Sequence, residues 1–522
     1  MHTWLLATCL LAVHADAAHS DSRELARRID QRIAERLDAE GVKPAERADD
    51  AEFLRRLSLD LIGRIPTAAE VREFLKDGRP DKRTHLVDRL LADPQHSRHF
   101  ARVWRALLLP EAEIDSQIAY FQPGFEAWLA QRRHENAGFD KIVRELITVP
   151  IVGPDQPPQF VLRDLRRPNP VAFLASKQAE PAKIATSCVR IFLGVRLECA
   201  QCHDHPFDRW TQRQFWSQAA FFAGLQRRGR GPFAPLVETV DHRTSRLAET
   251  DKMVPAALLD GSAAHFDKQT TPRVQLAEWM TSRQNTFFAR AAANRIWGQL
   301  MGRGLVDPVD DFRESNPPSH PELLEALSAD FAASGFDLTR LYRAICLSSA
   351  YQRTSGRTGD QQSRPELYAS MSVKPLSGDQ FYDCLAQVIG NSPTDEPGRS
   401  EDNQDQDTLR RQLIRMFAAD EEAGYPKTSV AQALTLMNGS AVSEAVAPKT
   451  STRLKQTLAA SPASADRQVE DLYLTALSRY PTEVERRMMV DYCREAAAAE
   501  HARRLGDVFW VLLNSAEFRW NH

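Results

Sequence analysis

The sequence predicts a mainly α-helical protein with two helical domains, joined by a short segment that is extended or contains β-strands. Apolar residues recur at helical spacing along most of the chain, and alternating β-type patterns are rare. Glycine is sparse, with 23 residues in 522, and this length is enough for roughly two to four domains. The hydrophobic content of 43% excludes a disordered chain, and seven cysteines are too few for a disulfide scaffold.

Residues 1–18 have the pattern of a secretory signal peptide. An apolar run from Trp4 to Val13 precedes Ala15-Asp16-Ala17, a small-residue cleavage pattern. This run is too short to cross a bilayer, and no later stretch reaches the ~18 apolar residues of a membrane span. We therefore expect a periplasmic or secreted protein with no transmembrane segment after the signal peptide. The alternative is a cytoplasmic protein in which this run is a buried first helix.

The first helical domain is predicted over residues 22–225. An exposed helix over residues 22–48 is followed by an amphipathic helix that Gly63 ends. Thr67 and Glu70 then have the spacing of a capping box, in which each side chain bonds the backbone amide of the other residue. This pair predicts the start of the next helix.

A linker is predicted over residues 226–270, where the helical pattern stops. It contains the segments 237–240 and 253–255, which have the composition of short strands or extended chain. The second helical domain is predicted over residues 271–522, and the polar stretch from Asn391 to Asp407 is expected to be a mobile insertion within it. Lysine and arginine number 67 against 70 acidic residues, so no nucleic-acid partner is expected.

Two pairs of similar segments suggest that helical modules are duplicated. Residues 64–67 with Glu70 resemble residues 479–482 with Glu485, and Gly138-Phe139-Asp140 resembles Gly335-Phe336-Asp337. Capping boxes recur in many helical proteins, so independent helix starts are the alternative explanation.

The pentapeptide Cys199-Ala200-Gln201-Cys202-His203 has the C-x-x-C-H pattern of covalent haem attachment. Two thiols three positions apart on a helical turn can bond to the two vinyl groups of one haem. The adjacent imidazole then lies beside the iron as its proximal ligand. The motif predicts haem c held by Cys199, Cys202 and His203 in a protein of electron transfer or haem-dependent oxidation.

Other chemistry fits the same motif. Cys199 and Cys202 with His203 or His205 match a zinc or iron site. The two cysteines also match a redox dithiol or a disulfide. In either case the chain would be a non-haem binding or scaffold protein of the periplasm, in which the motif is a structural metal or disulfide site.

The sequence does not identify a distal haem ligand or a catalytic residue. Met253, Met280 and His242 are candidate distal ligands, but a role in packing or at the surface is expected for each. No phosphate-binding loop, nucleophile elbow or H-E-x-x-H motif occurs, so the sequence does not establish whether the protein is an enzyme.

The sequence also resembles known families. IFLGVRLECAQCHDHPFD at residues 191–208 and FLRRLSLDLIGRIP at residues 53–66 are similar to the planctomycete cytochrome-type domain of unknown function. Its usual partner, the planctomycete-specific domain, is resembled by residues 294–297, 302–306, 310–312, 316–319 and 512–518.

The resemblance implies an exported protein of a family whose biochemical role is not established. Its members accompany secreted sulfatase-like or carbohydrate-degrading proteins, so such proteins or a periplasmic redox protein are the expected partners. This chain departs from the family pattern because Cys188 precedes the motif. A disulfide from Cys188 to one motif thiol is therefore an alternative to a thioether.

Three further groups of residues have candidate roles. Asp307, Asp310 and Asp311 could bind a cation or pair with arginines, but turn chemistry explains them without a ligand. The aromatic residues after the motif are expected to form a core helix, with a haem slot as the alternative; they are Trp210, Phe215, Trp216, Phe221 and Phe222. Buried, inert thiols are expected at Cys346, Cys384 and Cys493.

Overall fold

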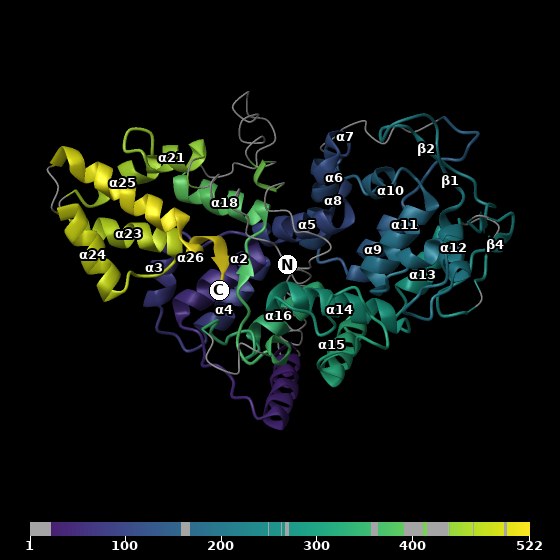
Figure 1. Cartoon of the computed structure of the whole chain (residues 1–522), viewed down its shortest axis with the longest axis horizontal. Coiled ribbons are helices and arrows are strands. Elements are labelled where there is room, and N and C mark those ends of the chain that lie inside the picture. The colour runs from purple at the N-terminus through teal and green to yellow at the C-terminus, as the bar shows by residue number, and fades with distance from the viewer. Residues whose placement is uncertain are drawn as a thin grey trace, which may run out of the picture. The chain divides into compact units, whose positions relative to one another are not determined.

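The computed structural model describes residues 22–157, 167–248, 250–262, 264–266, 271–356, 364–390, 410, 412–414, 437, 439–462, 464–494 and 498–522. The predicted signal peptide over residues 1–18 and the predicted insertion over residues 391–407 lie outside these ranges. The fold is mainly α-helical, as the sequence predicts, with three two-stranded antiparallel sheets in the described parts (Figure 1). None of the described helices is long and apolar enough to cross a membrane.

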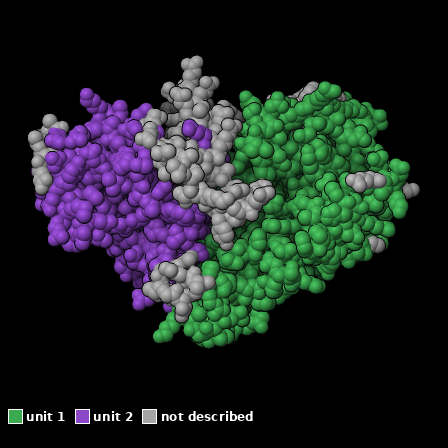
Figure 2. Space-filling model, viewed as in Figure 1, with its two compact units in different colours: residues 1–43, 97–351, 363–369 green, residues 44–96, 352–362, 370–522 purple. Residues whose placement is uncertain are grey.

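The chain divides into two compact units, each of which is built from separate stretches of sequence (Figure 2). Unit 1 consists of residues 1–43, 97–351 and 363–369, and unit 2 of residues 44–96, 352–362 and 370–522.

Unit 1 contains a helix over residues 22–40, two short hairpins and most of the remaining helices. Its elements after residues 22–40 are α5 (Pro94–Leu108, of which residues 94–96 belong to unit 2), α6 (Glu111–Ile114), α7 (Ser116–Ala119), α8 (Gln122–His134), α9 (Phe139–Thr148), α10 (Ala172–Ser176), α11 (Pro181–Cys188), η1 (Val189–Leu193), η2 (Glu198–Gln201), α12 (Gln212–Ala219), η3 (Ala220–Phe222), β1 (Leu225–Arg227), β2 (Leu236–Glu238), β3 (Thr244–Arg246), β4 (Met253–Pro255), α13 (Pro272–Met280), α14 (Thr286–Met301), α15 (Pro321–Ala333), α16 (Leu338–Leu347) and η4 (Pro365–Leu367).

Unit 2 is helical apart from one small sheet. Its elements are α2 (Asp50–Ile62), α3 (Ala68–Lys76), α4 (Lys82–Ala92), β5 (Lys374–Pro375), α18 (Gly378–Ile389), α21 (Ser440–Val446), α22 (Thr452–Ala460), α23 (Ala465–Leu477), α24 (Glu483–Arg494), α25 (Ala498–Asn514), α26 (Ala516–Arg519) and β6 (Trp520–Asn521).

The predicted extended segments form two antiparallel hairpins in unit 1. β1 pairs with β2, in register from Leu225 opposite Glu238, and β3 pairs with β4, in register from Thr244 opposite Pro255. β4 coincides with the predicted segment 253–255, and β2 overlaps the predicted segment 237–240 at residues 237 and 238. The β3–β4 hairpin packs against α12, which follows the cysteine motif.

The core of unit 1 contains a cluster of aromatic rings around Phe139. The ring centroid of Phe139 is 4.8 Å from that of Trp104, 5.4 Å from that of Phe288 and 6.4 Å from that of Phe331. The backbone N–H of Phe139 donates to the carbonyl of Phe336 at 3.0 Å. The two similar segments Gly138-Phe139-Asp140 and Gly335-Phe336-Asp337 therefore lie side by side in this core.

Unit 2 contains a helix pair that occurs twice. α2 and α23 are both 13 residues long, and each begins with a capping side chain, Asp49 for α2 and Ser464 for α23. Each helix ends at a residue in the left-handed region, Gly63 with a φ of 73° and Ser478 with a φ of 61°. α3 follows α2 and α24 follows α23. The two segments thus share the length of their first helix and the way that it is capped, while α3 has 9 residues and α24 has 12.

The predicted capping box forms in both copies. In the first, the N–H of Glu70 donates to Thr67 Oγ1 at 3.2 Å and the N–H of Thr67 donates to Glu70 Oε2 at 2.7 Å. In the second, Glu485 and Thr482 make the same two bonds at 3.3 Å and 2.8 Å. Each pair satisfies two amides that a helix start leaves without partners.

An arginine supports the carboxylate of each capping box. Arg64 donates from both terminal nitrogens to Glu70 at 3.0 Å and 3.1 Å, and Arg479 donates to Glu485 at 2.8 Å and 2.9 Å. Arg479 also bonds Glu517 through Nε at 2.6 Å and Nη2 at 2.8 Å. In the second copy, the arginine thus binds two carboxylates, and the second of them, Glu517, belongs to α26.

Replacing Glu485 by glutamine is expected to destabilise the protein at neutral pH but not in acid. The hydrogen bonds from Arg479 lower the pKa of Glu485 to about 2, below the 4.5 of an ordinary glutamate. Its ionised form therefore contributes fully above about pH 4.5, and the contribution is lost as the pH falls towards 2. Urea unfolding should show a stability difference between Glu485→Gln and the wild type that shrinks over this range. Glu470→Gln, on α23 and outside this ion pair, is the control, and a difference that is independent of pH would contradict the prediction.

Candidate functional site

The cysteine motif lies on a short turn of unit 1 that exposes its reactive groups. η2 (Glu198–Gln201) is a 3₁₀ turn, and Cys202 follows it directly. Because residues three apart eclipse each other in a 3₁₀ turn, Cys199 and Cys202 fall on the same side. Both thiols are free and exposed, and His203 is also exposed. We call Glu198–His203 the motif turn.

The two histidines of the motif differ in which nitrogen is available. Nδ1 of His203 donates to the carbonyl of Asp204 at 2.8 Å, which leaves the lone pair of Nε2 for a metal. Nδ1 of His205 instead accepts from the N–H of Phe207 at 3.2 Å, so a neutral His205 carries its proton on Nε2. His203 is therefore the better ligand. No three His, Cys, Asp or Glu side chains in the described ranges are grouped to hold a metal ion by themselves.

The start of α12 holds the motif turn in place. The N–H of Gln212 donates to Asp204 Oδ1 at 2.8 Å, and the side-chain amide of Gln212 donates to the carbonyl of Cys202 at 2.8 Å. Trp216 Nε1 donates to the carbonyl of Gln201 at 3.0 Å. Thr211 caps α12 in a capping box with Gln214. The two thiols thus sit on a backbone that side chains of α12 fix.

An acidic side chain from the loop after α14 fixes the chain just before the motif turn. Asp310 accepts from Arg190 Nε at 2.7 Å and from Arg196 Nη2 at 2.7 Å. Burial alone would raise the pKa of Asp310, but Arg190, Arg295 and Arg196 outweigh burial and hold that pKa below its ordinary value.

The aspartates on either side of Asp310 also pair with arginine. Asp307 lies 3.4 Å from Arg303, and Asp311 lies 3.2 Å from Arg313. These ion pairs favour the structural interpretation of the acidic cluster over a cation site.

Gly194 connects the π-helical turn η1 to this region and has no room for a side chain. Its φ is 71°, and a Cβ there would lie 2.5 Å from the ring of Phe312. The N–H of Phe312 donates to the carbonyl of Gly194 at 3.0 Å. The segment before the motif is therefore packed directly against the loop that carries Asp310.

A cavity of about 410 Å³ lies next to the motif segment within unit 1. Asp208, Arg209 and Trp210 line one side of it, directly after the motif, and Phe312 and Asn316 line another. The indole of Trp210 is 3% exposed, and its Nε1 has no hydrogen-bond partner among the described residues. A buried N–H donor without a partner in a cavity wall is typical of a site that a polar ligand atom or a water completes. We call this space the motif cavity.

The structure places the other sequence candidates in the core or at the surface. Cys188 is buried on α11 as a free thiol, and burial raises its pKa to about 12, whereas the motif thiols are exposed. Met280 is fully buried in α13, while Met253 and His242 are exposed. The three thiols predicted to be buried, Cys346, Cys384 and Cys493, are buried.

Most of the aromatic stripe after the motif is core, as expected. Phe215, Phe221, Phe222 and Trp210 are buried, and Trp216 is half-buried.

One residue of the site was not identified from the sequence. Phe207 is 77% exposed and lies four positions after His203. The segment HPFD gives no signal for this, because an isolated phenylalanine between polar residues is usually assigned to a core. An exposed phenyl ring in the segment that follows the motif offers apolar surface that a flat apolar group could cover.

Two family models match separate parts of the chain. Residues 28–227 match PSCyt2, described as a protein of unknown function (DUF1549). Residues 272–425 match PSD1, described as a protein of unknown function (DUF1553). The chain belongs to the proteins that carry these two domains in this order. No curated protein and no solved structure matches the chain.

The two families meet at the site. The PSCyt2 segment supplies the motif turn and Trp210, and the PSD1 segment supplies Asp310, Phe312 and Asn316. The motif cavity therefore combines the segment after the motif, from one domain, with a loop of the other.

Proposed function

We propose that this PSCyt2–PSD1 protein is an exported c-type haem protein that acts in electron transfer or haem-dependent oxidation. Cys199 and Cys202 would be the covalent anchors and His203 the proximal ligand. The observation that carries the proposal is the motif turn, in which two free, exposed thiols three residues apart precede a histidine whose Nε2 is available. Bound haem would supply a one-electron redox centre.

Several contacts support a fit between these residues and haem. The carbonyl of Asp204 fixes the tautomer of His203 and increases the basicity of its ring, as partners of metal-bound histidines do. Phe207, four residues after His203, offers an exposed apolar ring. Gln212 and Trp216 hold the backbone of the turn, so the anchors need little rearrangement. A periplasmic redox protein is the partner expected for such a site.

Haem attachment can be tested on the full-length protein made in a host with cytochrome c maturation. The proposal predicts a Soret band that survives acid–acetone extraction and is lost in Cys199→Ala/Cys202→Ala. His203→Ala is expected to shift the Soret band, because the proximal nitrogen is removed. His205→Ala is the matched control and should retain the wild-type spectrum, since its Nδ1 is already bonded to Phe207.

A colourless product would contradict the proposal. Stoichiometric zinc in that product would support the metal-site alternative, and a Cys199–Cys202 disulfide would support the disulfide alternative. Either result would leave a non-haem binding or scaffold protein, which the family resemblance links to carbohydrate breakdown.

A further inference from the structure

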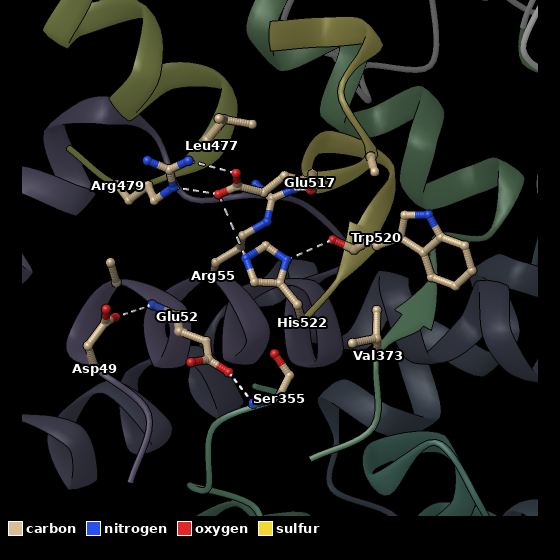
Figure 3. A pocket seen from close by; sticks show the side chains of 12 residues that line it. Asp49, Glu52, Arg55, Ser355, Val373, Leu477, Arg479, Glu517, Trp520 and His522 are labelled. Atoms are coloured by element: carbon tan, nitrogen blue, oxygen red, sulfur yellow. Dashed lines mark hydrogen bonds and ion pairs between the residues drawn. The ribbon is translucent and has the colours of Figure 1, made fainter. Parts of the chain in front are cut away.

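Unit 2 contains a cavity of its own, of about 620 Å³ (Figure 3). This volume lies within the range of small-molecule sites, which is roughly 300–1,000 Å³. The cavity is formed by the start of α2, the end of α23 and the end of the chain, so both copies of the repeated helix contribute to it. Nothing in the haem proposal uses it.

The arginines that line this cavity have almost no donors left for a ligand. All the N–H groups of Arg479 point to acceptors of the protein, namely Glu517, Glu485 and the carbonyl of Tyr480. Arg55 is 1% exposed, and its two terminal nitrogens bond four acceptors. Only Nε of Arg55 lacks a partner among the described residues, and it is buried. The cavity is therefore poor in available donors.

Acceptors, in contrast, remain available around the cavity. Asp49 uses Oδ1 to cap α2, which leaves Oδ2 for a ligand. His522 donates from Nδ1 to the carbonyl of Trp520 at 3.4 Å, so the neutral ring presents an acceptor at Nε2. Burial, and then the charge of Arg55, lower the pKa of His522, which favours this neutral form.

One of these acceptors, Nε2 of His522, lies close to the carboxylate of Glu517, and neither atom has a proton to give to the other. Nε2 of His522 is 3.9 Å from Oε1 of Glu517. A nitrogen atom that carries at least two hydrogens could donate to both from one position. Figure 3 shows His522 between the Arg479–Glu517 pair and Glu52, where such a nitrogen would be surrounded by acceptors.

The rest of the lining suits the body of such a ligand. The indole of Trp520 and the side chains of Val373 and Leu477 face the cavity and provide apolar and aromatic surface. An aromatic ring face attracts cations, and indole does so most strongly. The lining thus combines hydrogen-bond acceptors, carboxylate charge and an aromatic surface.

We propose that the cavity of unit 2 binds an organic cation, in which an ammonium or guanidinium group is carried on an apolar body. The cation donates to His522 and Glu517, Asp49 contributes charge at the rim, and the apolar body packs against Trp520. A free amine and a lysine or arginine side chain of a partner protein carry the same group, so the site recognises either source by the same chemistry.

The test uses the full-length protein and three probes with the same phenyl body: phenethylamine, 2-phenylethanol and 3-phenylpropionate. Calorimetric titration is expected to show phenethylamine binding about tenfold or more tightly than the neutral and anionic probes. Equal affinities for the three probes, or no binding of phenethylamine at millimolar concentration, would overturn the proposal. Since the titration needs no haem, its result is independent of the haem proposal.

Two cavity variants and one control variant separate recognition from folding. Asp49→Asn keeps the helix cap, because asparagine caps as well as aspartate, and should weaken phenethylamine binding about fivefold. Asp337→Asn changes the matching cap of α16 in unit 1 and should leave binding unchanged. Trp520→Leu should weaken binding by about three- to tenfold. Wild-type affinity in both cavity variants would overturn the proposal.

A peptide probe distinguishes the two sources of the cation. An acetylated and amidated Gly-Lys-Gly peptide that binds more tightly than phenethylamine would assign the site to a basic side chain of a partner. Weaker binding of the peptide than of phenethylamine would assign it to a small amine. Both outcomes support a cation site.

Discussion

Replacing Arg273 by methionine is expected to lower the free energy of unfolding of unit 1 by about 3–5 kcal/mol. Arg273 is 1% exposed and forms an ion pair with Glu238, which is 3% exposed. It also donates to the carbonyls of Ile147 and Val149. Without Arg273, the carboxylate of Glu238 would be buried without a counter-charge and two carbonyls would lose a donor. Urea unfolding measures the loss, and hydrogen exchange in α9 and α13 locates it.

A second replacement shows whether the loss comes from the isolated charge. In Arg273→Met/Glu238→Met both charges are absent, and about half or more of the lost stability should return. The exposed pair Arg503–Glu500 offers a surface control, since Arg503→Met should change stability too little to measure. A double variant as unstable as Arg273→Met would show that packing, and not the buried carboxylate, dominates.

Arg55→Met is expected to destabilise unit 2 by about 3–5 kcal/mol. Arg55 donates to the carbonyls of Ala476, Glu517 and Phe518 and to Ser478 Oγ, so it joins α2 to the end of α23 and to α26. Methionine retains the apolar stem but leaves these acceptors without a donor. Faster hydrogen exchange should appear in α2, in α23 and in residues 516–522.

The control for this change is an arginine of the same unit at the surface. Arg72 on α3 pairs with Asp471 at 2.9 Å and its side chain is 40% exposed. Arg72→Met should cost less than about 1 kcal/mol, because water screens an exposed pair. Equal losses in Arg55→Met and Arg72→Met would contradict the role assigned to the buried hydrogen bonds.

The sequence predicted the parts of the fold that depend on neighbouring residues. The end of α2 at Gly63 and the capping box of Thr67 and Glu70 are local, and both occur as expected. The short strands at residues 236–238 and 253–255 are local too. The segments that come together as unit 2 could not be predicted in this way, because their assembly depends on contacts between residues that are far apart in the sequence. Arg55 and Ala476, for example, are 421 residues apart.

Of the candidate site, only the motif residues could be predicted from the sequence. The spacing of Cys199, Cys202 and His203 identified the reactive groups without any structure. That Asp310 fixes the arginines before the motif, and that Phe312 packs against Gly194, depends on tertiary contacts. The sequence also could not show that Phe207 stays exposed, since exposure is set by the surrounding chain.

The pairing of α2 with the end of the chain has a consequence for biosynthesis. At about 5–20 residues per second, a ribosome needs about 20–80 s to make the 421 residues between Arg55 and Ala476. During that time Leu59 of α2 cannot pack into the core that it shares with Leu472 and Tyr473 of α23. Unit 2 therefore cannot complete its folding until α23 has been made. A chaperone that shields this helix during synthesis would protect it from aggregation.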